Sequence, residues 1–104
     1  MKKLLRNLSI YIILLLYPVL VFAQDMSRNY ENLVVTAVEM MGAGKSDSAK
    51  VILNQVVRDD ADNDAAWYYL SQIAIRENEA DLAEACLLNA IEIDPGNFWY
   101  RYRL

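Results

Sequence analysis

Residues 64–97 read DAAWYYLSQIAIRENEADLAEACLLNAIEIDPGN, and this stretch decides the fold. Its apolar residues recur at spacings of three and four, which predicts amphipathic helices rather than strands. One helix is expected over residues 65–77, with Asp64 as its N-cap, and a second over residues 80–93. Pro95 ends the second helix, because proline lacks a backbone N–H and disfavours the helical state in the residue before it.

Two more helices are expected upstream, one over residues 27–42 and one that follows Ser46 or Asp47 and runs to about residue 58. The Gly42-Ala43-Gly44 segment ends the first of them, because glycine tolerates the left-handed conformation found at helix ends. Ser46 or Asp47 is expected to cap the second. No window after residue 24 alternates strictly between apolar and polar residues, so the sequence predicts an all-α fold.

The 64–97 stretch also carries a spaced signature of one tryptophan, several small residues and a proline. Its members are Trp67, Leu70, Ser71, Ala74, Ala83, Leu87, Ala90 and Pro95. These offsets resemble the 34-residue signature of the tetratricopeptide repeat family, with departures at Ser71, where the family has glycine, and at Ala74, where it has tyrosine. The resemblance implies an α-solenoid of helix-turn-helix units, in which small residues allow close approach and large ones fill the gaps.

One repeat length toward the N-terminus, a weaker copy of the same pattern occurs. The corresponding packing positions are Leu33, Ala37, Ala49, Leu53 and Val56. We therefore expect a first repeat over residues 30–63, a second over 64–97, and over 98–104 the start of a third that continues in a longer protein. About three repeats are usually needed to cover the apolar faces, so a further repeat, a partner or self-association is expected to cover the last one.

Residues 1–23 differ from the rest, and residues 24–29 lead from them into the first helix. A basic start precedes an uncharged run over residues 8–22, and Val21-Phe22-Ala23 places small residues before Gln24. This layout predicts a secretory signal peptide, in helical form before the repeats. The apolar run is shorter than the roughly 20 residues that span a membrane, so membrane attachment is expected only if the signal stays uncleaved. The short, lysine-led signal favours export to a bacterial periplasm or cell envelope.

Removal of the signal leaves an acidic chain. The sequence has ten Lys and Arg and fourteen Asp and Glu, and three of the basic residues (Lys2, Lys3 and Arg6) precede residue 24. The remaining chain has seven basic and fourteen acidic residues, which gives a net charge of −7. Such a domain repels phosphates, which argues against nucleic-acid binding.

The sequence contains no site that would support catalysis. It has no histidine, which excludes the Ser-His-Asp and Cys-His arrangements and removes the commonest transition-metal ligand. Cys86 is expected to be a packed, inert thiol. Asp60, Asp62 and Asp64 resemble the first half of a calcium loop, but the glycine and glutamate that complete such a loop are absent. We therefore expect no enzyme, no metal and no cofactor.

The resemblance further implies a peptide groove lined by the first helix of each repeat. The matching positions are Val34 and Val38 in the first repeat and Tyr68, Gln72 and Arg76 in the second. Such a surface suits an extended or helical peptide. Family members that hold a terminal carboxylate carry Lys and Asn where Val34 and Val38 stand, which argues against that ligand. Alternatively, the two valines pack beneath a neighbouring segment.

The expected function is therefore that of an exported scaffold for protein–protein or protein–peptide interaction. The alternative is that the chain forms the N-terminal repeat region of a larger envelope protein. The larger protein would then be a sensor, a peptidase or a transporter accessory protein, and its catalytic or signalling part would lie beyond residue 104.

Overall fold

A computed structural model describes residues 11–12, 14–15 and 29–104 of the chain. Within these residues the secondary structure is helical, with turns and no strand, so the predicted all-α fold is confirmed. The predicted signal peptide lies outside the described residues, apart from two short helical pieces at residues 11–12 and 14–15. None of the described helices is long and apolar enough to cross a membrane.

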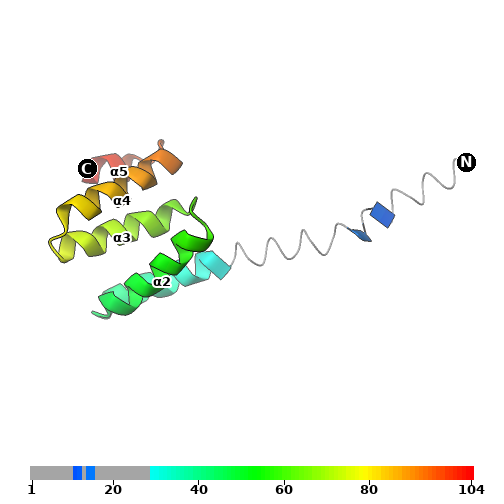
Figure 1. Cartoon of the computed structure of the whole chain (residues 1–104), viewed down its shortest axis with the longest axis horizontal. Helices are drawn as coiled ribbons and strands as arrows, with labels where there is room; N and C mark the ends of the chain where they lie inside the picture. The colour runs from blue at the N-terminus through cyan, green and yellow to red at the C-terminus, as the bar shows by residue number, and fades with distance from the viewer. Residues whose placement is uncertain (1–10, 13, 16–28) are drawn as a thin grey trace, which may run out of the picture.

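The helices follow one another in chain order, each joined to the next by a short turn (Figure 1). A first helix covers residues 29–42. The others are α2 (Ser46–Asp59), α3 (Asp64–Arg76), α4 (Ala80–Ile93) and α5 (Phe98–Arg103). Helix α3 packs against both α2 and α4, and α5 packs against α4. This arrangement is the stacked helix-turn-helix array expected of an α-solenoid.

The turns inside the two helix pairs have the same geometry, at positions one repeat length apart. Gly44 and Asn78 both adopt positive φ, at 79° and 62°. In each turn the next residue donates its backbone N–H five residues back, from Lys45 to Met40 at 2.8 Å and from Glu79 to Ala74 at 2.9 Å. This backbone pattern satisfies the last carbonyls of a helix. Asn78 adopts the left-handed conformation here, which asparagine tolerates better than most residues.

The turns that lead into α3 and α5 are also equivalent in the two repeats. Asn63 caps α3, and its side chain accepts a hydrogen bond from the Ala66 N–H at 3.1 Å. Asn97 also caps α5 with its side chain, accepting from the N–H of Trp99, two residues on, at 3.1 Å. The prediction of Asp64 as the cap of α3 is wrong, because Asp64 is already the first helical residue. Asn63 precedes Asp64 by one position, and its amide oxygen accepts from one of the N–H groups that are free in the first turn of the helix.

The predicted cap of α2 is also wrong. Helix α2 begins at Ser46, so the residue at its N-cap is Lys45, and no side chain caps it. Glu79 holds the same position before α4, again without a side-chain cap. The tight backbone hydrogen bonds in both turns satisfy carbonyls of the preceding helix, so they do not replace a side-chain cap of α2 or α4.

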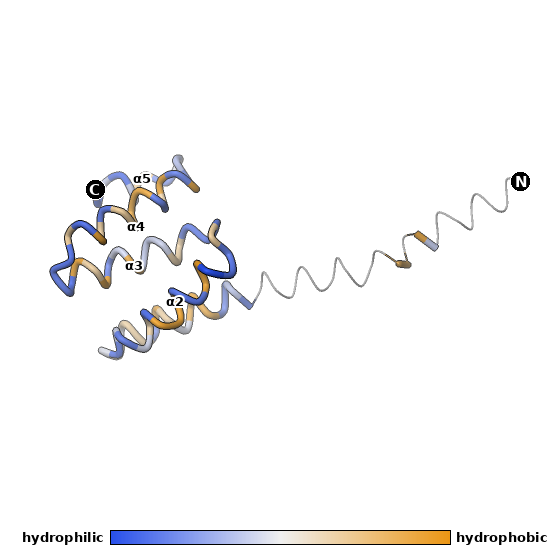
Figure 2. Tube along the Cα trace, viewed as in Figure 1, coloured by the Kyte–Doolittle hydropathy of each residue, from blue (hydrophilic) through white to orange (hydrophobic). Residues whose placement is uncertain are grey.

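The main core lies between the first helix and α2, α3 and α4. Its buried aliphatic side chains are interspersed with alanines, which let the helices approach closely. Figure 2 shows that hydrophobic residues recur along α2, α3 and α4. The buried members of the main core are Val34, Ala37, Met41, Ala49, Leu53, Val56, Ala66, Leu70, Ile73 and Cys86. A second, smaller cluster joins Leu87 and Ala90 of α4 to Tyr100 of α5. This second cluster attaches α5 to the rest of the array.

Candidate functional site

Helix α3 carries the polar and aromatic residues of the candidate site on one side. Tyr68, Gln72 and Arg76 stand four residues apart, and residues at this spacing lie on the same face of a helix. Tyr68 and Gln72 are half-buried, and Arg76 is exposed. The opposite side of α3 is buried in the core through Ala66, Leu70, Ile73 and Ala74. The buried side thus fixes which residues of α3 remain accessible.

Three contacts hold α5 beside this side of α3. The Tyr100 hydroxyl donates a hydrogen bond to Asp64 Oδ2 at 2.7 Å. The Tyr100 ring stacks on Tyr68, with ring centroids 5.1 Å apart. At the other end of α5, Arg103 Nη1 donates to Gln72 Oε1 at 2.9 Å. The two helices therefore present one continuous surface.

A hollow of about 360 Å³ lies on this surface. It is lined by Ala65, Tyr68, Tyr69, Asn97, Trp99, Tyr100 and Arg103. Tyr69 meets Tyr68 edge to face, with ring centroids 5.2 Å apart, while Trp99 is 65% exposed. We call Tyr68, Tyr69, Gln72, Arg76, Trp99 and Arg103 the α3–α5 face. Aromatic walls beside a guanidinium can hold both an apolar ring and an anionic group.

The buried position of Tyr100 has a consequence at high pH. Burial of the ring and then the hydrogen bond to Asp64 raise the pKa of its phenol well above the ordinary value of 10.0. Above that value the unfolded chain releases a proton that the folded chain keeps, so folding stability falls as the pH rises. Below it both states are protonated, and the contribution of Tyr100 is fully present.

We therefore expect the Tyr100→Phe variant to lose less stability than the native chain when the pH is raised from 8 to about 11. Urea unfolding at both pH values, followed by circular dichroism, measures the difference. Both chains contain the other tyrosines, so any effect of those residues on the stability change is the same in the two chains and cancels in the comparison. An identical loss in the two chains would show that Tyr100 keeps its ordinary pKa.

The structure places the five predicted groove residues in two different settings. Val34 is 7% exposed within the main core, and Val38 is half-buried against the same core. Tyr68 lines the hollow, Gln72 accepts the hydrogen bond from Arg103, and Arg76 is exposed one turn further along α3. The groove assignment stays a prediction, and its accessible part is the one on α3.

The residues at the predicted repeat-packing positions mostly lie in the interior. The buried ones are Ala37, Ala49, Leu53, Val56, Leu70, Ser71, Ala83, Leu87 and Ala90. Leu33 and Trp67 are partly buried against the core, and Pro95 is exposed in the turn before α5. Trp67 also donates its indole N–H to the Ala61 carbonyl at 2.8 Å, which ties the α2–α3 turn to α3.

The sequence pattern did not reveal the α5 contribution to the site. One signal was present, because Tyr100 stands one repeat length after Ala66. Since Ala66 is fully buried, the repeat length indicates that Tyr100 also faces inward. No comparable signal pointed to the contacts of Arg103. The residue one repeat length before it is Tyr69, which has no charge. Exposed side chains such as Trp99 and Arg103 follow no apolar spacing rule.

The other candidate groups do not form a second site. Cys86 is 5% exposed, and burial raises the pKa of its thiol, which lowers its thiolate fraction at neutral pH. Asp64 accepts the Tyr100 hydroxyl and lies at the start of α3. In the part of the chain that the structure describes, no group of three or more His, Cys, Asp or Glu residues is placed to hold a metal ion.

A small cavity of about 120 Å³ opens on another side, between α2, α3 and α4. An ion pair lies at it, in which Lys50 Nζ and Glu77 Oε2 are 2.8 Å apart. Cys86 and Leu70 contribute to the apolar lining of this cavity. The cavity is much smaller than the hollow on the α3–α5 face.

Comparison with known proteins agrees with this architecture. The family model described as tetratricopeptide repeat matches residues 40–104, which is more than half of the chain. The chain therefore belongs to the tetratricopeptide repeat family, and the predicted membership is confirmed. Searches of the curated proteins and of the solved structures returned no match. Repeats of this family act as interaction modules for other proteins and are typically not catalytic.

Proposed function

We propose that the chain is a scaffold that binds a protein or peptide partner through the α3–α5 face. The observation that carries the proposal is the hollow between α3 and α5, which combines aromatic walls with an exposed arginine. Helices joined by several contacts offer a preformed surface, and a preformed surface reduces the entropy cost of binding. The family supports the general role, and the hollow supports its location.

The test places a photoreactive residue on this face in the cells that naturally produce the protein. Trp99, which is 65% exposed, is replaced by p-benzoylphenylalanine, and the control carries the same residue at Val51, which is 67% exposed on α2. We expect a discrete adduct from position 99 and none from position 51. The partner in the adduct is then identified and purified, and its binding to the full chain is measured by titration.

Two results would count against a scaffold that works through this face. One is the absence of adducts at position 99, and the other is the same adduct at both positions. The titration adds a stricter requirement, because the purified partner must bind the native chain more tightly than the Trp99→Ala variant.

We further propose that the protein is exported to a bacterial periplasm or envelope. The basic residues before residue 7, the uncharged run over residues 8–22 and Ala23 before Gln24 support this proposal. Intact mass measurement of the protein from fractionated cells is expected to give a chain that begins at Gln24 in the envelope fraction. A chain beginning at Met1 in the cytosol would contradict the proposal.

A further inference from the structure

We infer that the partner segment recognised by the α3–α5 face is acidic and carries an aromatic side chain. The inference rests on the proposed function and names the chemistry of the occupant. The aromatic ring of the partner enters the hollow, and carboxylates of its neighbouring side chains bind Arg103, which contacts Gln72, and the exposed Arg76, four residues after Gln72 on α3.

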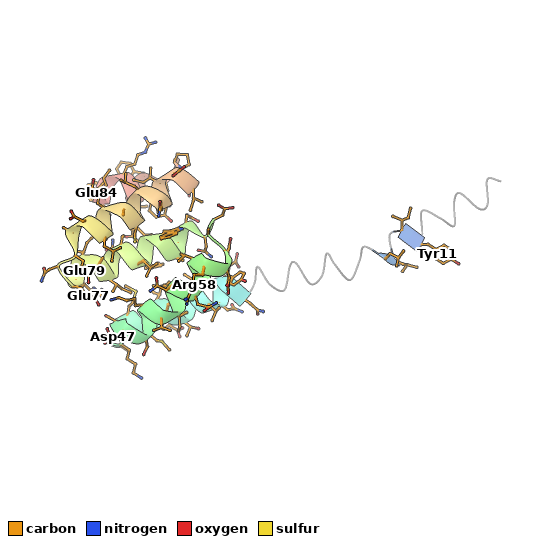
Figure 3. All side chains as sticks on the ribbon, in the orientation of Figure 1. Tyr11, Asp47, Arg58, Glu77, Glu79 and Glu84 are labelled. Atoms are coloured by element: carbon orange, nitrogen blue, oxygen red, sulfur yellow. The ribbon has the colours of Figure 1, made fainter. Side chains whose placement is uncertain are left out.

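The charges of the described chain are unevenly placed. Residues 29–104 contain six Lys and Arg and thirteen Asp and Glu, a net charge of −7. Many of the acids lie in the turns and at the helix starts, and Figure 3 shows Asp47, Glu77, Glu79 and Glu84 along one edge of the helix stack. Helix α5 instead has the sequence FWYRYR, with two arginines and no acid. Most of the molecule therefore repels an acidic segment, and the arginines of α5 attract it, while Glu84 at the end of that edge borders a hollow together with Arg103.

The arginine end of the face lies away from the acid of α3, Asp64. Asp64 stands eight residues before Gln72 on α3, which corresponds to roughly 12 Å along a helix. Its carboxylate already accepts the hydroxyl of Tyr100. Glu84 of α4 borders another hollow together with Arg103, but no ion pair joins the two among the described residues. Arg103 contacts Gln72 at the far end, so the bound segment is expected to place its carboxylates there.

Arg103 is well prepared to bind a carboxylate. A guanidinium has five N–H donors in a fixed plane, and the contact to Gln72 uses Nη1 at 2.9 Å. That contact orients the group while other donors remain available, and Arg103 as a residue is exposed. Paired N–H donors on a carboxylate give stronger and more directional hydrogen bonds than neutral pairs.

The hollow supplies the second half of the recognition. Its aromatic lining comes from Tyr68, Tyr69, Trp99 and Tyr100, and its volume of about 360 Å³ is large enough for an aromatic side chain. Aromatic rings prefer edge-to-face or offset contacts with one another, as Tyr68 and Tyr69 already show. An acidic segment without a ring would leave this hollow unfilled.

The experiment measures fluorescence anisotropy of labelled peptides titrated with the full chain as purified from its producing cells. The first probe has the sequence Gly-Asp-Glu-Trp-Glu-Asp-Gly, blocked at both ends so that only side-chain carboxylates carry charge. A second replaces the tryptophan by alanine, and a third replaces every acid by lysine. We expect the first probe to bind at least tenfold more tightly than either of the others, and its affinity to fall as salt is added.

Matched variants locate the binding. Arg103→Glu is expected to weaken binding of the first probe at least tenfold. Arg58→Glu is its control. Arg58 is also exposed and donates to a glutamine (Gln55, at 3.1 Å), and its replacement changes the net charge of the chain by the same amount. Trp99→Ala is expected to weaken binding similarly, whereas Leu88→Ala removes an apolar side chain of α4 that is 46% exposed and outside the hollow lining, with little effect. Circular dichroism checks that each variant folds.

Several outcomes would overturn the inference. They are equal binding of all three probes, no binding of any probe, equal weakening by Arg103→Glu and Arg58→Glu, and formation of a dimer that the first probe cannot displace in sedimentation experiments. The last would mean that a second copy occupies the face. If the photoreactive residue at position 99 still yields a partner while the probes fail, the acidic partner is rejected and the scaffold role stands. If the adduct is also absent, both are rejected.

Discussion

Replacing Leu53 with alanine is expected to lower the free energy of unfolding by about 3 kcal/mol, within the range of roughly 2–5 kcal/mol found for buried leucines. Leu53 has no exposed surface and lies in the main core between α2 and its neighbours. Truncation removes every side-chain carbon beyond Cβ, and the surrounding helices can close only part of the gap. A domain of this size has little stability in reserve, so the variant should be largely unfolded at modest urea concentration.

Urea titration followed by the helical circular dichroism signal measures this loss. Val51→Ala is the control on the same helix, because Val51 is 67% exposed and its truncation should change stability by less than about 0.5 kcal/mol. A loss below about 1 kcal/mol at Leu53 would be incompatible with its position in a close-packed core.

The second large effect is expected from adding volume where two helices meet. Ala49 has no exposed surface, and Ala49→Leu should lower stability by about 1–3 kcal/mol because the side chain has no space to enter. The equivalent change in the second repeat, Ala83→Leu, should cost less. Ala83 is 6% exposed and borders a hollow of about 310 Å³ that also touches Ile75, Leu87 and Leu104.

The same urea titration compares the two leucine variants. A larger loss at Ala83 than at Ala49 would contradict the packing described for α2 and α4. The comparison is sharper than either measurement alone, since the substitution and the position in the repeat are the same.

The helices were largely predictable from the sequence because apolar spacing and helix-ending residues are local signals. Helix α4 occupies the predicted residues 80–93, and α5 begins at Phe98, where the third repeat was expected to start. The caps were less predictable, since Asn63 and Asp64 are both good capping residues and the backbone geometry of the turn selects between them. Lys45 stands at the N-cap of α2 without capping it, because an ammonium group has no acceptor for the helix N–H groups.

The candidate site was predictable only in part. The resemblance to the repeat family implied Tyr68, Gln72 and Arg76 as groove positions, but it implied Val34 in the same way, and Val34 is buried in the core. Which face of a helix is covered depends on its neighbours, and a single-helix pattern contains no information about them. The contact between Arg103 and Gln72 joins residues 31 positions apart, and it arises from the placement of α5 beside α3.

The contact between Tyr100 and Asp64 links local folding to recognition. Helix α5 has six residues, and a helix this short is not stable in water without packing partners. Its order therefore depends on α3 through Asp64 and Tyr68, and on α4 through the second hydrophobic cluster. Trp99 and Arg103 are in position only while α5 is docked, so a ligand that touches them favours the docked state over the open one. A substitution that makes α5 open more easily should therefore also lower ligand affinity, and bound ligand should protect α5 from opening.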